Sequence, residues 1–263
     1  MGKGVKDIMF NVIAVIQARL NSSRLPQKVL QKINGKTLLE IIINRISQSR
    51  YIEKIIIATS IAKTDDALYE FVKKNIDHEI VRGSLDNVLE RFYSVSLQYP
   101  SKYIVRITAD DPFKDAQIID ECIEQVIQNP ELDYCSNTLE PTYPEGLDIE
   151  VFNTTALKKA YKEASLNSEK EHVTPYIWKN PKIFNIQNLK YKENLSSWRW
   201  TVDKPQDFIF AQEIYKHFNY DFSVSYKDII EYLKNNKHLL SINNDTIRNE
   251  GYLKSIKEEK CKN

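Results

Sequence analysis

Short apolar runs of strand length alternate with amphipathic helical runs through the first half of this chain. The short runs are almost continuously apolar, which is typical of parallel strands covered by helices on both faces. The expected strands are 12–17, 54–60, 79–82 and 103–110, and the expected helices are 36–49, 64–75, 88–97 and 115–128. This alternation predicts an α/β fold in three layers, with a mostly parallel, doubly wound, twisted sheet at its centre.

The pattern changes after residue 138. A turn marked by proline and glycine leads into an alternating strand that ends at residue 152. Helical segments are expected at 155–163, 169–178 and 205–218, and strands at 183–190 and 198–203. Because no repeat or flexible linker interrupts the chain, we expect one domain over 11–240. Around it we expect an N-terminal extension at 1–10, a small inserted β/α elaboration at 139–200 and a frayed tail at 241–263.

Composition excludes several classes of protein. A formal charge of +1 gives no global basic field, so nucleic acid is not an expected partner. The three cysteines form no CxxC pair and suggest no disulfide framework. The start lacks the apolar segment of a signal peptide, and no run is long enough to span a membrane. We therefore expect a cytoplasmic protein with no membrane partner.

A cationic loop follows the first strand. It contains three basic side chains and two hydroxyls within ten residues: Arg19, Ser22, Ser23, Arg24 and Lys28. Guanidinium groups form paired hydrogen bonds to phosphate oxygens, and a lysine adds a point charge. Open α/β sheets bind their ligands at the carboxyl ends of the strands, where this loop is expected. The loop predicts phosphate binding, with a plain solvated surface loop as the alternative.

Two aspartates are expected at the ends of separate strands. Asp110 ends the run at 103–110 and is followed by Asp111 and Pro112, while Asp203 ends the run at 198–203. Magnesium binds a few protein carboxylates and takes its remaining ligands from water and phosphate. Asp110 and Asp203 are therefore candidate ligands of a shared Mg²⁺. The alternative is that each aspartate only caps the helix that follows it.

Other catalytic patterns are absent from the sequence. It contains no GxxxxGK[ST], no GxGxxG after the first strand, no HExxH and no GxSxG. The four histidines lie far apart, and of these His172 is the one that could reach a site. Phosphate-binding cations beside metal-binding carboxylates favour phosphoryl or nucleotidyl transfer, in which the protein positions groups and neutralises charge.

Six ordered motifs carry a family resemblance over about residues 11–216. They are Arg19-x-x-Ser22-Ser23-Arg24-x-Pro26-x-Lys28, Arg82-Gly-Ser-x-Asp-Asn-Val-Leu89, Arg106-Ile-Thr-Ala-Asp-Asp-Pro112, Tyr143-Pro-x-Gly-Leu-Asp-Ile-Glu-Val-Phe152, Glu171-His-Val-Thr-Pro175 and Arg199-Trp-Thr-Val-Asp203. Together they resemble the cytidylyltransferases that activate 3-deoxy-manno-octulosonate and acylneuraminates. The closer resemblance is to the family of spore coat polysaccharide biosynthesis protein F. The resemblance implies a Rossmann-like, glycosyltransferase-A-like fold for nucleotide-diphospho-sugar chemistry.

The resemblance also implies a reaction and a set of roles. CTP and an anionic sugar-like acceptor would give a CMP- or CDP-linked product and pyrophosphate, with Mg²⁺ held by Asp110 and Asp203. Arg19 and Lys28 would bind the triphosphate and act with Asp110 in catalysis. The remaining nucleotide contacts would come from Gln17, Ala18, Ser22, Ser23, Arg24, Arg82, Ser84, Thr108 and Ala109. Asp148, Glu150 and His172 would face the acceptor. The related enzymes are commonly dimers, which makes 139–190 the expected interface of a homodimer.

The sequence departs from the family pattern twice within the cationic loop. Asn21 and Gln27 stand where glycine is usual. Asparagine tolerates a positive φ, so Asn21 is expected to keep the turn, whereas Gln27 is harder to accommodate. Two further interpretations stay open at this stage: the same fold using another nucleoside triphosphate, and a non-catalytic nucleotide-binding protein. The acceptor is not identified by the sequence.

Overall fold

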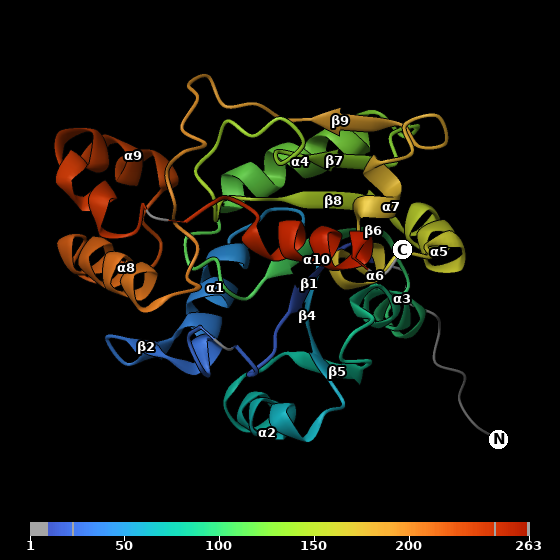
Figure 1. Cartoon of the computed structure of the whole chain (residues 1–263), viewed down its shortest axis with the longest axis horizontal. Helices are drawn as coiled ribbons and strands as arrows, with labels where there is room; N and C mark the ends of the chain where they lie inside the picture. The colour runs from blue at the N-terminus through green and yellow to red at the C-terminus, as the bar shows by residue number, and fades with distance from the viewer. Residues whose placement is uncertain (1–9, 23, 245, 262–263) are drawn as a thin grey trace.

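The computed structural model describes residues 10–22, 24–244 and 246–261 (Figure 1). Seven strands form one sheet in the order β5–β4–β1–β6–β8–β7–β9. Their bounds are β1 Phe10–Gln17, β4 Lys54–Ser60, β5 Glu79–Gly83, β6 Ser101–Thr108, β7 Tyr134–Ser136, β8 Glu150–Asn153 and β9 Ile186–Asn188. β8 runs antiparallel to both of its neighbours, and the other neighbouring strands of this sheet pair in parallel. The expected mostly parallel sheet is confirmed. Of the expected extension at 1–10, residues 1–9 lie outside the described residues.

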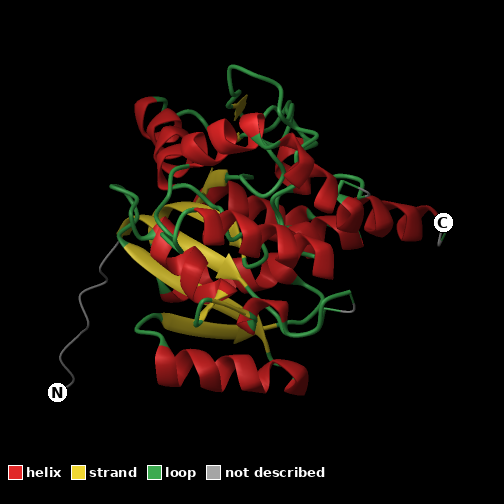
Figure 2. Cartoon of the chain, turned by 90° about the vertical axis from the view of Figure 1, so that its left-hand side faces the viewer, coloured by secondary structure: helices red, strands yellow, loops and turns green. Residues whose placement is uncertain are grey.

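Helices cover both faces of the sheet (Figure 2). One face packs against α1 (Leu38–Ile46), α2 (Asp66–Asn75) and α4 (Ala116–Gln128), with α8 (Pro205–His217) and α9 (Tyr226–Asn235) joining the same core. The other face packs against α3 (Val88–Gln98) and α5 (Thr154–Glu163). This is the three-layer arrangement that the alternating sequence predicts.

Strand β1 is buried on both faces. Val12, Ala14 and Ile16 belong to one core and Ile13 and Val15 to the other, and all five are fully buried. Side chains alternate between the two faces of a strand, so a strand covered on both sides must be apolar at every position. This explains the continuous apolar run and places the loop that follows at the carboxyl edge of the sheet centre.

The segment 198–203 differs from the expected strand. It forms no strand, and an isolated bridge joins Arg199 to Glu145. Trp200 and Val202 are fully buried, but Arg199 and Thr201 are buried as well, so the apolar alternation of the sequence does not mark one buried and one exposed face. The segment lies against a turn around Gly146, whose φ is +103°, and a Cβ added there would stand 2.7 Å from the Thr201 amide nitrogen, so the turn favours glycine. The expectation of a sheet strand at 198–203 was wrong because the pattern reports burial and not the pairing partner.

The chain after residue 236 is more ordered than the sequence predicts. A 3₁₀ helix, η3, spans Lys237–Ile242, and helix α10 spans Glu250–Lys260. In Figure 1, α10 crosses the centre of the view. It lies beside α6 (Asn167–His172), which is followed by α7 (Pro175–Trp178). The frayed tail expected from residue 241 is therefore wrong for the helical part of this segment.

The remaining elements are short. A two-stranded hairpin, β2 (Lys32–Ile33) and β3 (Lys36–Thr37), follows the 3₁₀ helix η1 (Lys28–Leu30), and η2 (Lys63–Asp65) precedes α2. Across the part of the chain that the structure describes, no helix is long and apolar enough to cross a membrane.

Candidate active site

Lys28, Asp110 and Asp203 meet at one point. Lys28 Nζ lies 2.9 Å from Asp110 Oδ2 and 2.7 Å from Asp203 Oδ1. Lys28 opens η1 after the β1 loop, Asp110 follows β6, and Asp203 precedes α8. Three residues singled out separately in the sequence thus form a single cluster at the carboxyl edge of the sheet.

The charges of Lys28 and Asp110 hold each other ionised. Burial alone would raise the pKa of Asp110, but the Lys28 ammonium outweighs it, and the pKa falls to about 2. Burial alone would lower the pKa of Lys28, but the two carboxylates outweigh it and raise the pKa. At neutral pH the site therefore presents two carboxylates around one cation.

Arg199 fixes the position of Asp203. Its guanidinium contacts Asp203 Oδ2 at 3.2 Å, Asp207 Oδ1 at 2.9 Å and Glu145 Oε2 at 2.7 Å. The Val202 amide donates to the Asp110 carbonyl at 2.8 Å, which brings the two candidate ligands together. Arg199 belongs to one of the six motifs, but the sequence predicts no role for it, because its partners Glu145, Asp203 and Asp207 come from different segments that only the fold brings together.

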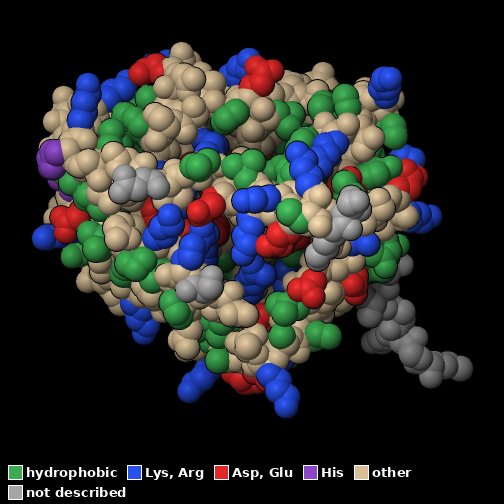
Figure 3. Space-filling view, in the orientation of Figure 1, with side chains coloured by type: hydrophobic (Ala, Val, Ile, Leu, Met, Phe, Trp, Pro, Cys, Tyr) green, Lys and Arg blue, Asp and Glu red, His purple; other side chains and the backbone are tan. Residues whose placement is uncertain are grey.

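The cationic loop spreads over the edge of this cluster. Arg24 contacts Asp203 Oδ2 at 3.0 Å and also pairs with Glu250 of α10. Arg19 is exposed, and the Ser22 hydroxyl accepts a hydrogen bond from the Leu25 amide at 3.3 Å. Ser23 lies outside the described residues. In Figure 3, basic and acidic side chains gather at the centre of the face that α10 crosses in Figure 1.

Gln27, and not Asn21, takes the left-handed conformation in this loop. The φ of Gln27 is +52°, and Asn21 is not among the residues with positive φ. The expectation that Asn21 keeps the turn through a positive φ was wrong. Gln27 immediately precedes Lys28, the first residue of η1, so the strained backbone conformation lies directly before the lysine of the site.

The other nucleotide candidates line the ends of β1, β5 and β6. The Gln17 side chain accepts a hydrogen bond from Arg106 at 3.0 Å, and the Ala18 and Ala109 amides bond to neighbouring strands. Thr108 donates to Asp111, and the Ser84 hydroxyl accepts from the Asn87 amide at 3.1 Å.

Arg82 is anchored by the protein itself. It donates to the Ser60 carbonyl at 2.8 Å and contacts Asp66 Oδ1 at 2.6 Å, while its guanidinium lies over the Tyr69 ring. The structure thus brings Arg24, Lys28, Asp110 and Asp203 into direct contact. Arg82 and Ser84 stand apart at the end of β5.

The acceptor candidates lie on the side of the inserted elaboration. Glu150 is buried, pairs with Arg106 and accepts hydrogen bonds from Tyr134 at 2.8 Å and from Thr174. Burial alone would raise the pKa of Glu150, but Arg106 and the two hydroxyls outweigh it, and the pKa is lowered. Glu150 is therefore a fully partnered anion that fixes Arg106.

Asp148 and His172 both touch the C-terminal segment. Asp148 pairs with Arg248, and His172 Nε2 lies 3.1 Å from the Ser255 hydroxyl. Burial, followed by the charge of Arg106, lowers the pKa of His172 to about 4. Arg248 and α10 were not predicted as part of the site, because no motif in the sequence signals contacts with a tail expected to fray.

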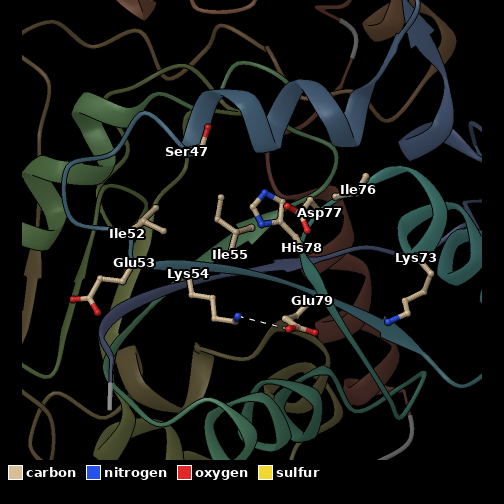
Figure 4. A pocket seen from close by; sticks show the side chains of 10 residues that line it. All are labelled: Ser47, Ile52, Glu53, Lys54, Ile55, Lys73, Ile76, Asp77, His78 and Glu79. Carbon is tan, nitrogen blue, oxygen red and sulfur yellow. Dashed lines mark ion pairs between the residues drawn. The ribbon is translucent and has the colours of Figure 1, made fainter. Parts of the chain in front are cut away.

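The cavity shown in Figure 4 lies away from this cluster. Its volume is about 570 Å³, and its lining includes Lys54 and Glu79, the first residues of β4 and β5. It therefore opens at the amino edge of the sheet, opposite the candidate site.

Comparisons with known proteins identify the family. Residues 13–254 match the cytidylyltransferase family. The spore coat polysaccharide biosynthesis protein SpsF of Bacillus subtilis is 32% identical over 236 residues, covering 87% of this chain and 96% of that protein. A cytidylyltransferase structure from Leptospira borgpetersenii superposes with a TM-score of 0.84 at 30% identity, covering 90% of this chain and 99% of that one.

A more distant structure shares the fold. CMP:2-keto-3-deoxy-manno-octonic acid synthetase complexed with CTP gives a TM-score of 0.61 at 15% identity, covering 79% of this chain and 99% of that one. The chain belongs to the cytidylyltransferase family and is a nucleotidyltransferase. The resemblance drawn from the six motifs is confirmed.

Proposed function

We propose that this protein is a Mg²⁺-dependent cytidylyltransferase that uses CTP to activate an anionic, sugar-like acceptor with release of pyrophosphate. The observation that carries this proposal is the meeting of Lys28, Asp110 and Asp203 at the carboxyl edge of the sheet. A surface polysaccharide or glycoconjugate is the proposed destination of the product, supported by the name of the SpsF relative. We also propose that the protein acts in the cytoplasm, which is consistent with the use of CTP.

The donor set fits Mg²⁺. One carboxylate oxygen of Asp110 and one of Asp203 both contact the same cation, the Lys28 ammonium. Within the described ranges there is no group of three or more His, Cys, Asp or Glu that could hold a metal. Magnesium suits such a site because it commonly takes one or two protein carboxylates and completes its shell with water and phosphate oxygens. Asp110 and Asp203 would hold it, and when bound it would neutralise charge on the phosphate oxygens.

The transfer itself needs positioning and charge neutralisation from the protein. An acceptor oxygen attacks the α-phosphorus of CTP, the bond to the β-phosphate oxygen breaks, and pyrophosphate leaves with the electron pair. Lys28, once separated from the aspartates, and Arg19 neutralise the departing pyrophosphate. Arg24 and Ser22 support the triphosphate, and Arg82, Ser84, Thr108 and Ala109 lie on the side of the ribose and base.

The acceptor would bind beside the inserted elaboration, near Asp148, Glu150 and His172. Arg106, fixed by Glu150 and Gln17, is the cation best placed to receive an anionic group there. Ulosonic acids, sugar phosphates, alditol phosphates and phosphonates all combine an anion with an oxygen nucleophile. We propose a homodimer with residues 139–190 at the interface, which sedimentation of the purified protein would test.

A pyrophosphate-release screen tests the proposed function. Purified protein is incubated with CTP and Mg²⁺ against the four acceptor classes, with UTP, ATP and GTP in parallel. We expect release with one acceptor class, with CTP as the preferred donor, and no release after chelation with EDTA. Preference for another triphosphate would overturn the assignment of CTP. Tight CTP binding with no release across the panel would favour a non-catalytic protein.

A further inference from the structure

Arg91 is a buried arginine without hydrogen-bond partners at two of its nitrogens. The residue lies in α3 and is 2% exposed. Within the residues that the structure describes, neither Nε nor Nη1 of Arg91 has a partner. Leaving a buried charged donor unpaired is costly, and a lone buried cation more so. Such a group needs an explanation beyond packing.

The Arg91 side chain lies beneath the carboxyl edge of the sheet. A Cβ added to Gly83, at the end of β5, would stand 2.7 Å from Arg91 Cγ. Gly83 separates Arg82 from Ser84, the two residues that the family resemblance assigns to the nucleotide. The absence of a side chain at Gly83 thus gives Arg91 room directly below that part of the candidate site.

The electrostatic surroundings of Arg91 favour an anion. Burial and then the charge of Arg19 lower the pKa of Arg91 to about 10, and Asp65 opposes them. The Asp65 carboxylate is already occupied, because it accepts hydrogen bonds from the Leu20 amide at 2.7 Å and from the Ser60 hydroxyl. The guanidinium groups of Arg91 and Arg19 are therefore opposed by one carboxylate, Asp65, which is already hydrogen-bonded to other groups. This leaves a net positive charge beside the cationic loop.

We propose that Arg91 is a nucleotide-binding residue whose guanidinium donates to a phosphate group of the bound nucleoside triphosphate, next to Arg19. The proposal rests on the proposed function and names a further residue of the same site. A bound phosphate would balance the excess positive charge and give the guanidinium an acceptor for Nε and Nη1, which have no partner among the described residues.

Arg45 offers a matched control, because it is equally buried but fully paired. It is 3% exposed, donates to the carbonyls of Phe222 at 2.9 Å and Val224 at 3.0 Å, and pairs with Asp115 at 3.4 Å. Removing a paired buried charge breaks a network, whereas replacing an unpaired one by an apolar side chain removes a destabilising group. The two arginines should therefore respond in opposite directions to the same substitution.

The experiment compares the wild-type protein with R91M, R91K and R45M. Melting temperatures are measured without ligand, and CTP affinity with Mg²⁺ is measured by calorimetry well below those temperatures. We expect R91M to melt no lower than wild type while its Kd for CTP rises about 10- to 100-fold, the loss typical of a charge-assisted hydrogen bond. R91K keeps the charge but loses the paired donors of the guanidinium, so it should recover only part of the affinity. R45M should melt lower and bind CTP like wild type.

Each outcome bears on the proposal. Unchanged CTP affinity in R91M overturns it, whatever the melting temperature, and a lower melting temperature would then make Arg91 a structural residue. If the wild-type protein itself binds neither CTP nor another triphosphate, the proposed function fails, and the role of Arg91 fails with it.

Discussion

Lys28 pairs with the two aspartates that are proposed to bind the metal ion, so it must change partners when the metal binds. Its ammonium neutralises Asp110 and Asp203. If a divalent cation binds those carboxylates, like-charge repulsion will displace the ammonium toward the triphosphate that arrives with the metal. In the proposed mechanism, Lys28 would thus neutralise two partly exposed carboxylates before the substrates bind and become available to the leaving group afterwards.

The first prediction concerns Asp110. D110N should lower kcat by about two to four orders of magnitude, since charge neutralisation is the dominant catalytic contribution at such sites. The adjacent D111N is the matched control, because Asp111 instead pairs with the buried Lys114 at 2.8 Å. D111N should lower the melting temperature but keep turnover in the folded protein. Steady-state pyrophosphate release measures both, and near-wild-type turnover in D110N would contradict the assignment.

The second prediction concerns the pH dependence set by His172. Its pKa of about 4 in the folded protein lies below the unfolded value of about 6.5, so the unfolded chain binds more protons between these values. This contribution to stability is complete above pH 6.5 and is lost as the pH falls toward 4. It amounts to at most about 3 kcal/mol.

Urea unfolding of wild type and H172Q at pH 7 and pH 4.5 measures this effect. H172Q should show the smaller loss of unfolding free energy between the two pH values. Burial also lowers the pKa of His78, which lies at the opposite edge of the sheet. The same substitution at His78 is the comparison, because it removes a histidine away from the candidate site. Equal losses in wild type and H172Q would mean that His172 is not held neutral by its surroundings.

At the scale of elements, periodicity found the structures that bury an apolar face against the sheet. The expected strand at 54–60 matches β4, because a short, continuous apolar run is typical of a parallel strand covered on both faces. The expected helix at 115–128 matches α4 almost residue for residue, because its apolar residues repeat at helical spacing. The segment 198–203 shows the limit. Its alternation comes from burial of Trp200 and Val202 beside a turn, which spacing alone cannot distinguish from pairing with a strand.

The C-terminal helix α10 was missed for a different physical reason. None of its residues is buried, so it carries no strong amphipathic signal, and its order comes from polar contacts with remote segments. Glu250 pairs with Arg24, and Glu259 accepts from the Ser168 hydroxyl at 3.0 Å. The first pair is separated by 226 positions in the chain and the second by 91 positions, so neither contact can be recognised from the local sequence. Lys28, Asp110 and Asp203 could therefore be predicted from the local sequence, although Asp203 does not end a strand, whereas the contacts of α10 could not.

The third prediction tests whether α10 competes with the nucleotide. Glu250 neutralises Arg24, a residue proposed to support the triphosphate, so E250Q should tighten CTP binding about two- to fivefold. Both partners are more than a third exposed, so the unfolding free energy should change by less than about 1 kcal/mol.

E258Q is the control on the same helix, since Glu258 pairs only with Lys254 one turn away at 3.8 Å among the described residues. Calorimetric titration with CTP compares the two variants. Weaker or unchanged CTP binding in E250Q would indicate that the pair with Arg24 does not restrain the loop.

At the scale of the whole molecule, the segment after residue 243 ties together parts of the chain that the sheet alone leaves separate. Lys204 contacts Thr246 at 2.9 Å, Arg248 pairs with Asp148, and the Asn249 amide donates to Glu145 at 3.0 Å. Together with the contacts of α10 on Arg24 and His172, these bonds connect the cationic loop, the segment that carries Asp203 and the inserted elaboration. The candidate site is closed by the end of the chain and not by the sheet.

The fourth prediction follows from this closure. A protein that ends at residue 243 keeps the sheet and both cores. It loses the hydrogen bonds that Thr246, Arg248, Asn249, Glu250, Ser255 and Glu259 make with the rest of the chain, each worth about 1 kcal/mol or less. We expect a melting temperature lower by about 5–15 °C with the α/β circular dichroism retained. CTP should still bind through Lys28 and Arg19, whereas turnover of the acceptor should fall, since Asp148 loses Arg248.

The same truncation should change the pH dependence of stability. Because Tyr252 and Ser255 would no longer cover His172, its pKa should rise toward the usual value. The stability lost between pH 7 and pH 4.5 should then shrink as it does in H172Q, which urea unfolding at the two pH values measures. A truncated protein with the wild-type melting temperature and pH dependence would show that the C-terminal segment does not close the site in solution.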